Sequence, residues 1–276
     1  MRFLSVCLLI LSICPALLKA QTYSEWIESS FKYLDENRLD SAEMALKNAL
    51  KAEPDYPVNA FLFHNLGTVQ RRQGKNEEAL QSYTLALTRY PENTVFLSAR
   101  ASLFSDKGDF KNALLDYNTL LEKEPDNEEA LYQRGLLYLE IKNFELSERD
   151  FGRMMELNPQ SFYARLGFAS LYKIEGLYTD AEKIYNYLEE KEPDNPAIYA
   201  GRAELFLLTE KGGKALSDSN KAIRLSDETG NAYLYILRSK AKLLLHEKKS
   251  AAEDIEKAMV LGYDPEEAAA LLKFTK

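Results

Sequence analysis

The side chains that most often carry chemistry are scarce in this chain. Its 276 residues include two histidines, His64 and His246, and two cysteines, Cys7 and Cys14. So few thiols and imidazoles leave no room for a Cys/His zinc cage. The sequence also contains no nucleophile elbow, phosphate-binding loop or His-Glu metal motif. We therefore expect a protein that is not an enzyme and that uses no cofactor and no metal.

The charge balance excludes a further class of function. The chain has 35 Lys and Arg against 43 Asp and Glu, a formal net charge of −8. Sequence-independent binding of nucleic acid needs clustered Lys and Arg to neutralise phosphates, so we expect no nucleic-acid partner. The hydrophobic content of 46% is that of a globular protein rather than a disordered one.

One charged pattern recurs along the sequence. Four arginines each precede an aspartate by sixteen residues: Arg100 and Asp116, Arg134 and Asp150, Arg202 and Asp218, Arg238 and Asp254. Residues placed symmetrically about the turn of an antiparallel helical hairpin lie side by side, and Gly108 is eight residues from both members of the first pair. The pattern favours salt bridges that fix the register of two helices over a row of arginines that binds a ligand.

A period of 34 residues defines the elements that would position these pairs. Prolines recur at Pro54, Pro91, Pro125, Pro159 and Pro193. Upstream of each proline come a turn signal, then a small residue, then a large apolar one. The turn signals include RQGKN (72–76), DKGDF (106–110) and IEGLY (174–178). Each unit is therefore predicted to be helix, tight turn, helix and a Pro-marked loop.

This pattern resembles the tetratricopeptide repeat family, whose unit carries W-x2-L-G-x2-Y, then A-x3-F, then P. The second unit shows Leu66, Gly67, Gly74, Ala79, Tyr83, Ala86 and Pro91, and the first shows Trp26, Tyr33, Ala42, Leu46, Ala49 and Pro54. The resemblance implies an all-α fold, a right-handed α-solenoid of helix-turn-helix repeats. The expected repeats are about 23–56, 60–93, 94–127, 128–161, 162–195, 196–229 and 232–265.

The C-terminal segment is predicted to be a capping helix over 264–275. Asp264 suits an N-cap and Pro265 the first helical position. Leu271, Leu272 and Phe274 are expected to cover the last repeat, because a solenoid otherwise exposes its terminal stacking face.

Residues 1–20 have the build of a secretory signal peptide, with a basic start at Arg2, an apolar run and Ala20 as the last residue before cleavage. The solenoid would then occupy 21–276 and contain no cysteine. We expect export to a bacterial periplasm or cell surface, with no integral membrane span after cleavage.

Alternatives to this cleavage remain. Cleavage after Ala16 is one of them. Lipid attachment at Cys14 is another, although Ile13 is larger than the residue that normally precedes a lipidated cysteine. An uncleaved anchor would need an apolar stretch of about 20 residues, and Pro15 and Lys19 interrupt this one.

The resemblance further implies that the first helix of each unit lines a concave groove in which partners bind. Counting from the start of each unit gives these groove candidates: His64, Thr68, Arg71, Ser98, Ser102, Tyr132, Leu136, Tyr163, Leu166, Ser170, Glu204, Tyr233, Ile236 and Lys240. Packing between repeats is the alternative for each of them. Tyrosines offer large contact area at low entropic cost.

These candidates and the acidic total favour a protein or peptide partner with an apolar or cationic segment. The clamp of Lys, Asn and Arg with which some family members bind acidic chaperone tails is not visible. The leading hypothesis is therefore an exported protein-interaction scaffold. The alternative is a structural component of a cell-envelope complex that acts through the solenoid ends or the convex face.

Overall fold

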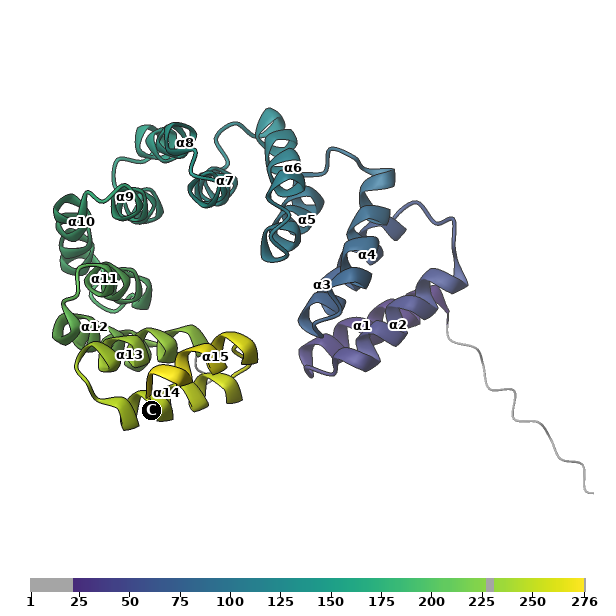
Figure 1. The fold of residues 1–276 in the computed structure, drawn as a ribbon. Helices are drawn as coiled ribbons and strands as arrows, with labels where there is room; N and C mark the ends of the chain where they lie inside the picture. The colour runs from purple at the N-terminus through teal and green to yellow at the C-terminus, as the bar shows by residue number, and fades with distance from the viewer. Residues whose placement is uncertain (1–21, 227–230, 276) are drawn as a thin grey trace, which may run out of the picture. The chain divides into compact units, whose positions relative to one another are not determined.

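The computed structural model describes residues 22–226 and 231–275. The expected signal peptide lies outside them. The described part of the chain is all helical, and its first fourteen helices form seven hairpins (Figure 1). The hairpins are α1 (Tyr23–Asp35) with α2 (Leu39–Ala52), α3 (Asn59–Arg72) with α4 (Asn76–Arg89), α5 (Thr94–Asp106) with α6 (Phe110–Lys123), α7 (Glu128–Glu140) with α8 (Phe144–Leu157), α9 (Phe162–Ile174) with α10 (Tyr178–Lys191), α11 (Pro196–Leu208) with α12 (Gly212–Leu225), and α13 (Ala232–Leu244) with α14 (Lys248–Val260). The predicted all-α, helix-turn-helix class is confirmed.

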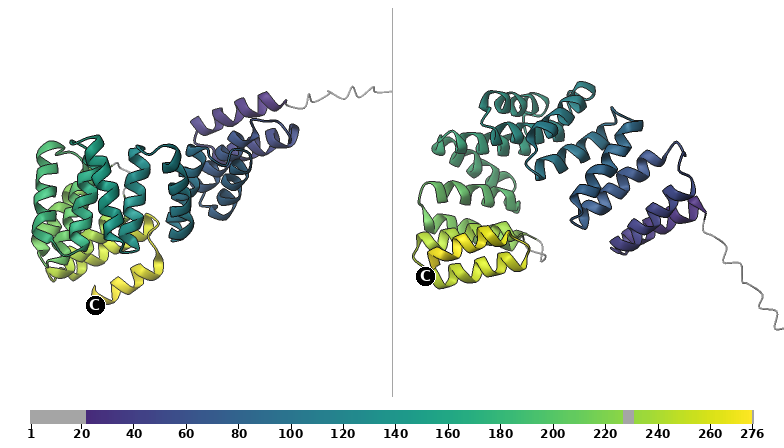
Figure 2. Two further views of the ribbon diagram at one scale, coloured as in Figure 1. Left: turned by 90° about the horizontal axis from the view of Figure 1, so that it is seen from above. Right: turned by 45° about the vertical axis from the view of Figure 1, so that its right-hand side comes forward.

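The chain divides into two compact units. Unit 1 runs to Ala99 and unit 2 begins at Arg100, so the boundary falls within α5. In unit 2 the first helices α7, α9, α11 and α13 lie on the inner side of an arc, and the second helices α8, α10, α12 and α14 lie on its outer side (Figure 1). Two further views show the teal and green helices of unit 2 packed side by side in sequence order (Figure 2).

The helix ends follow the sequence signals. In the first five hairpins the second helix stops two residues before the proline, as α6 does before Pro125. Asn127 and Asn195 then cap the next helices, because their side chains accept hydrogen bonds from free N–H groups at Ala130 and Ala197. Proline and asparagine together therefore fix where the repeats that begin with α7 and α11 start.

Each hairpin turn contains one residue in the left-handed conformation. Three of them are the glycines of the predicted turn signals, Gly74, Gly108 and Gly176, at φ +75°, +74° and +82°. The other four turns use residues with a side chain, namely Asn37, Lys142, Glu210 and His246. The tight turn is therefore required by the hairpin geometry even where glycine is absent.

The core pairs a glycine with an aromatic ring. A Cβ on Gly67 would come within 2.8 Å of the Tyr83 ring of the same hairpin. Phe151 is fully buried between Gly135 of its own hairpin and Gly167 of the next, and a Cβ on either glycine would lie 2.5 Å from the ring. Glycines of the first helices therefore make room for the large aromatic rings of the second helices, both within one hairpin and between neighbouring hairpins.

The predicted cap is present as α15 (Pro265–Leu272) and a short 3-10 turn, Lys273–Thr275. Asp264 accepts hydrogen bonds from the backbone N–H groups of Glu266 and Glu267. Ala268, Leu271 and Leu272 pack against Ile255 and its neighbours. Phe274 does not cover the last repeat as expected and is 67% exposed, because the chain leaves the helix at Leu272 and turns.

Candidate partner-binding surface

The four Arg–Asp pairs are all present as two-pronged salt bridges. In the fourth repeat the Nε and Nη2 atoms of Arg134 lie 2.8 and 2.6 Å from the two carboxylate oxygens of Asp150. The same geometry recurs at Arg100, Arg202 and Arg238. Each pair joins the two helices of one hairpin, so these residues serve the fold rather than an exposed ligand site.

Three of these arginines have a second partner, an asparagine, which the sequence reasoning missed. The Nη1 atom of Arg134 donates to Asn118 of the preceding repeat at 2.7 Å. Arg202 and Arg238 donate in the same way to Asn186 and Asn220. The three asparagines fall on the 34-residue period, a signal that could have revealed them. Each of these three arginines therefore joins its own hairpin and also fastens it to the one before.

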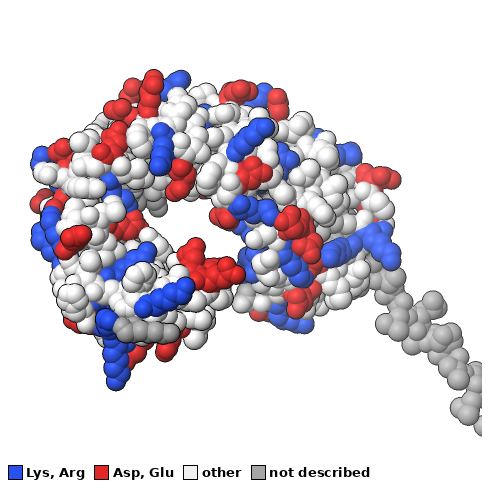
Figure 3. Space-filling model, viewed as in Figure 1, with Lys and Arg blue, Asp and Glu red and all other residues white. Residues whose placement is uncertain are grey.

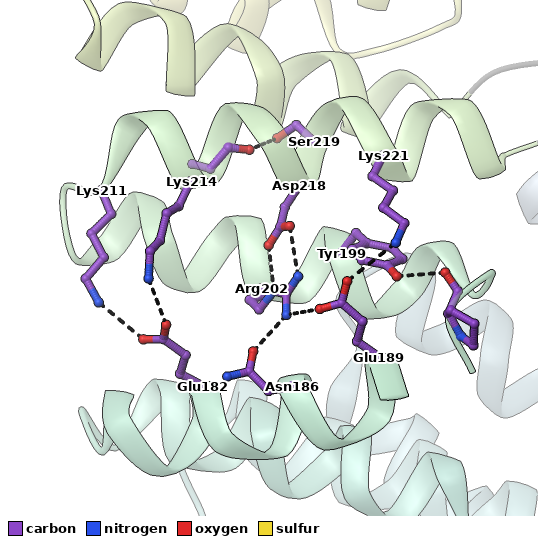
Figure 4. A network of polar contacts seen from close by, with 12 residues as sticks. Glu182, Asn186, Glu189, Tyr199, Arg202, Lys211, Lys214, Asp218, Ser219 and Lys221 are labelled. Atoms are coloured by element: carbon purple, nitrogen blue, oxygen red, sulfur yellow. Dashed lines mark hydrogen bonds and ion pairs between the residues drawn. The ribbon is translucent and has the colours of Figure 1, made fainter. Parts of the chain in front are cut away.

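The boundary between the fifth and sixth repeats has the densest of these networks (Figure 4). Arg202 also donates to Glu189 at 2.5 Å, and Lys221 lies 3.4 Å from the same carboxylate. Nearby, Glu182 accepts from Lys211 and Lys214. Burial alone would lower the pKa of Arg202 and raise that of Glu189, but the ion pairs outweigh burial and shift both pKa values toward the charged forms.

Several groove candidates lie on the inner face of unit 2. Tyr163 is 55% exposed, and its ring centroid lies 5.3 Å from that of the half-buried Tyr132. Together with Glu128, Glu129 and Gln133 these rings line a pocket of about 390 Å3. Burial raises the pKa of Tyr132 to about 12, so its hydroxyl stays neutral at physiological pH.

A polar bridge crosses the same face farther along. Glu204 on α11 contacts Lys173 on α9 in an ion pair and accepts a hydrogen bond from the Tyr233 hydroxyl on α13 at 2.9 Å. Burial, followed by the nearby Glu204 carboxylate, raises the pKa of Tyr233. Three successive inner helices are therefore connected through one carboxylate whose charge is already matched.

The remaining candidates of this face divide into surface and core. Leu136 and Ser170 are half-buried, and Lys240 is exposed beside a pocket that also contains Leu207 and Phe274. Leu166 and Ile236 are not groove residues, since they are 9% and 0% exposed. Leu166 packs into the core around Tyr185, and Ile236 packs against Ile255 under the cap. Both residues lie at the edge of the groove, and their apolar side chains point toward the boundary between repeats.

The candidates near the N-terminus do not gather into a comparable pocket. His64 stacks on Phe96 with ring centroids 5.1 Å apart, and its Nδ1 lies 3.4 Å from the side-chain oxygen of Asn65. Burial lowers the pKa of His64, so it is a packed, neutral ring. Thr68 is exposed and bonds back to the His64 carbonyl, while Arg71, Ser98 and Ser102 are half-buried.

Among residues 22–226 and 231–275 no three His, Cys, Asp or Glu side chains are placed to hold a metal ion. Within the same ranges no helix combines the length and apolar character that a bilayer span requires. Figure 3 shows Lys, Arg, Asp and Glu interspersed over the surface it displays.

Comparison with known proteins identifies the repeats. Models described as tetratricopeptide repeat match residues 32–94 and 128–161, and one described as TPR repeat matches 101–141. A crystal structure of a tetratricopeptide repeat protein from Parabacteroides merdae is 45% identical, with a TM-score of 0.83, and the match covers 92% of this chain and 98% of that one.

Two further similarities are more limited. The crystal structure of yeast Tom70 is 18% identical, with a TM-score of 0.69, over 94% of this chain and 57% of that one, which shows the fold alone. A TPR repeat-containing thioredoxin of Arabidopsis thaliana is 35% identical over 81 residues, which are 29% of this chain. The chain matches only 20% of the length of that curated relative.

Proposed function

Because this chain belongs to the tetratricopeptide repeat family, whose members are typically non-catalytic protein–protein interaction scaffolds, we propose that it is an exported scaffold that binds a partner protein on the inner face of unit 2. The observation that carries this proposal is the pocket between Tyr132 and Tyr163. In this pocket exposed aromatic surface lies beside two glutamates, Glu128 and Glu129.

The chemistry of this pocket favours a cationic side chain. A lysine or arginine is attracted to the face of an aromatic ring and to a carboxylate in the same site. Glu128 is held in place because it accepts a hydrogen bond from Ser161 at 2.5 Å. Glu129 is exposed at the rim, where it can meet an incoming charge. The partner segment is therefore basic at this point and apolar beside it.

The polar bridge at Glu204 limits where on the inner face a positive charge of the partner can be recognised. Since Lys173 and Tyr233 already contact this carboxylate, Glu204 does not favour binding of a further cation in the middle of the inner face. A bound segment would place its basic residue at the Tyr132–Tyr163 pocket and lie over Tyr233 with less polar residues.

Site-specific photo-crosslinking tests this assignment. A benzoylphenylalanine at position 163 should crosslink one partner in the envelope fraction, while the same group at Glu190, exposed on α10, should not. Glu129→Lys should reduce the yield at position 163 at least tenfold, because it reverses the charge at the rim. Equal crosslinking from both positions, or a yield that Glu129→Lys leaves unchanged, would contradict the inner-face assignment.

Export is tested separately by N-terminal sequencing of the protein recovered from cell fractions. The expected product is periplasmic or at the surface and begins at Gln21. Unprocessed protein that begins at Met1 and is recovered from the cytosol would contradict export. A lipid-modified Cys14 would replace the cleaved form with an anchored one.

A further inference from the structure

The fifth repeat departs from the ionic pattern of its neighbours. At the positions of the recurring arginine and aspartate it carries Phe168 and Ile184. The preceding repeat carries Gly152, where the repeats before Arg134, Arg202 and Arg238 supply asparagine. All three substitutions fall at one boundary between repeats. At this boundary, all three positions of the arginine network are therefore occupied by residues without a polar side chain.

Phe168 and Ile184 line a hollow on the outer side of unit 2. We call it the outer groove; it is lined by Met155 of α8, Arg165, Phe168 and Tyr172 of α9, and Lys183, Ile184 and Tyr187 of α10. Its volume is about 320 Å3. At the next boundary the corresponding side of the molecule is crossed by the ion pairs of Glu182 and Glu189 (Figure 4).

The floor of the outer groove is rigid and aromatic. Phe168 contacts the fully buried Phe151 edge-on at 5.9 Å between ring centroids, and Tyr172 lies 6.0 Å from Phe168. The sulfur of Met155 lies beside Arg165. Such a floor offers apolar contact to an entering side chain without a large ordering cost.

The rim of the outer groove is cationic. The guanidinium of Arg165 lies 4.9 Å from the ring centroid of Tyr187, and the ammonium of Lys191 lies 5.6 Å from the same ring. Lys183 is exposed and pairs only at the surface with Asp180, and none of the groove-lining residues is acidic. By contrast, the pocket on the other side of α8 balances three arginines with three carboxylates.

We propose that the outer groove is a second docking site, which takes a large apolar side chain of a partner protein segment flanked by Asp or Glu. The apolar side chain enters between α8 and α10, and the flanking carboxylates meet Arg165 and Lys183 at the rim. This site goes beyond the proposed function, because it lies on the opposite side of the repeats from the inner face and selects the opposite charge. The scaffold would thus hold two segments at once.

A peptide library displayed on phage and selected on residues 21–276 provides the probe. Enriched peptides that bind here should carry Leu, Phe or Trp beside Asp or Glu. A synthetic copy should bind at least tenfold more weakly to Arg165→Glu/Lys183→Glu. The same loss is expected for Gly152→Asn/Phe168→Arg/Ile184→Asp, which introduces the ionic set of the neighbouring repeats and removes the aromatic floor of the groove.

A matched reversal of two exposed basic residues elsewhere, Lys111→Glu/Arg224→Glu, should leave the affinity within twofold. If the triple variant fails to fold, the rim reversal alone still decides, since it alters only surface charge. Selection that yields no acidic-apolar peptide, or binding that the rim reversal leaves unchanged, overturns the proposal. So does binding to anionic phosphatidylglycerol vesicles that the rim reversal abolishes while no peptide is enriched.

Discussion

The boundary between the fifth and sixth repeats is fastened by Arg202, whereas the boundary between the fourth and fifth is fastened by Phe168. Around Arg202 the guanidinium donates to Asp218, Asn186 and Glu189. Around Phe168 the contacts are between aromatic rings, those of Phe151 and Tyr172. The two boundaries join the same kind of hairpin with opposite chemistry.

The difference shows what each kind of contact leaves exposed. A buried guanidinium has to satisfy its donors with oxygen atoms that surround it, so the pocket at the ionic boundary of Arg134 and Asp150 is lined by charges of both signs. An aromatic contact has no such requirement, and part of its surface can remain open. The repeat geometry therefore tolerates either solution, but the aromatic boundary offers an apolar groove without acidic lining residues, whereas the ionic boundary at Arg134 offers charges of both signs.

The largest effect is expected from breaking the ionic boundary. Arg202→Met leaves Asp218, which is 7% exposed, without its cation and should lower the free energy of unfolding by about 3–5 kcal/mol. The double variant Arg202→Met/Asp218→Leu should recover most of this loss, because no unpaired charge remains. Urea denaturation followed by circular dichroism measures both, and additive effects of the two single changes would contradict the coupling.

The aromatic boundary should be sensitive to volume rather than charge. Gly135→Ala places a methyl group about 2.5 Å from the Phe151 ring and should cost about 1–3 kcal/mol of unfolding free energy through overpacking. Gly152→Ala on the same helix as Phe151 meets nothing within 4 Å and is the matched control, which should be neutral or slightly stabilising. Thermal melts compare them, and equal losses would show that helix propensity and not packing decides.

Unit 1 has a boundary based on a buried carboxylate, which makes its stability depend on acid pH. Burial alone would raise the pKa of Glu43, but hydrogen bonds from Lys47, Lys75 and Gln70 outweigh it and lower the pKa to about 2. A carboxyl with a lowered pKa stabilises the folded state above its unfolded pKa, and this contribution disappears as the pH falls from about 4.5 through about 2.

We therefore expect Glu43→Gln to cost about 1–2 kcal/mol of unfolding free energy near pH 7, a value reduced by solvent screening of the exposed lysines. The cost should shrink as the pH is lowered through that window. Urea titrations at several pH values measure it, with Glu28→Gln on the exposed face of α1 as the control. A cost that stays constant with pH would contradict the role of the ionised carboxylate.

The smallest effects are expected at the turns, which are common to both kinds of boundary. Gly108→Ala forces a side chain into φ +74° and should destabilise by about 1 kcal/mol. Lys142→Gly at φ +58° should change stability by less than about 0.5 kcal/mol, because relief of strain is offset by the greater freedom of the unfolded chain. Melting temperatures of the two variants measure this difference. A larger loss for Lys142→Gly than for Gly108→Ala would contradict the shared turn geometry.

Much of the fold was predictable because its signals are local and repeated. Pro125 and Gly108 mark helix ends through their own backbone restrictions, and the sixteen-residue spacing of Arg134 and Asp150 follows from hairpin symmetry. The partner Asn118 also falls on the period, with Asn186 and Asn220 at the equivalent positions. Leu166 and Ile236 were misassigned, since helical spacing alone does not separate the edge of a groove from a boundary between repeats.

The sequence by itself determined the family, the number of hairpins, their limits and the ion pairs within them, because each depends on residues close in the chain or at a fixed period. Only the tertiary structure decided which side chains of an inner helix remain exposed, that Tyr132 and Tyr163 share a pocket, and that Phe168 forms the floor of the outer groove. These outcomes depend on how neighbouring repeats pack against one another. The spacing of residues within a single hairpin does not specify which atoms of two repeats come into contact.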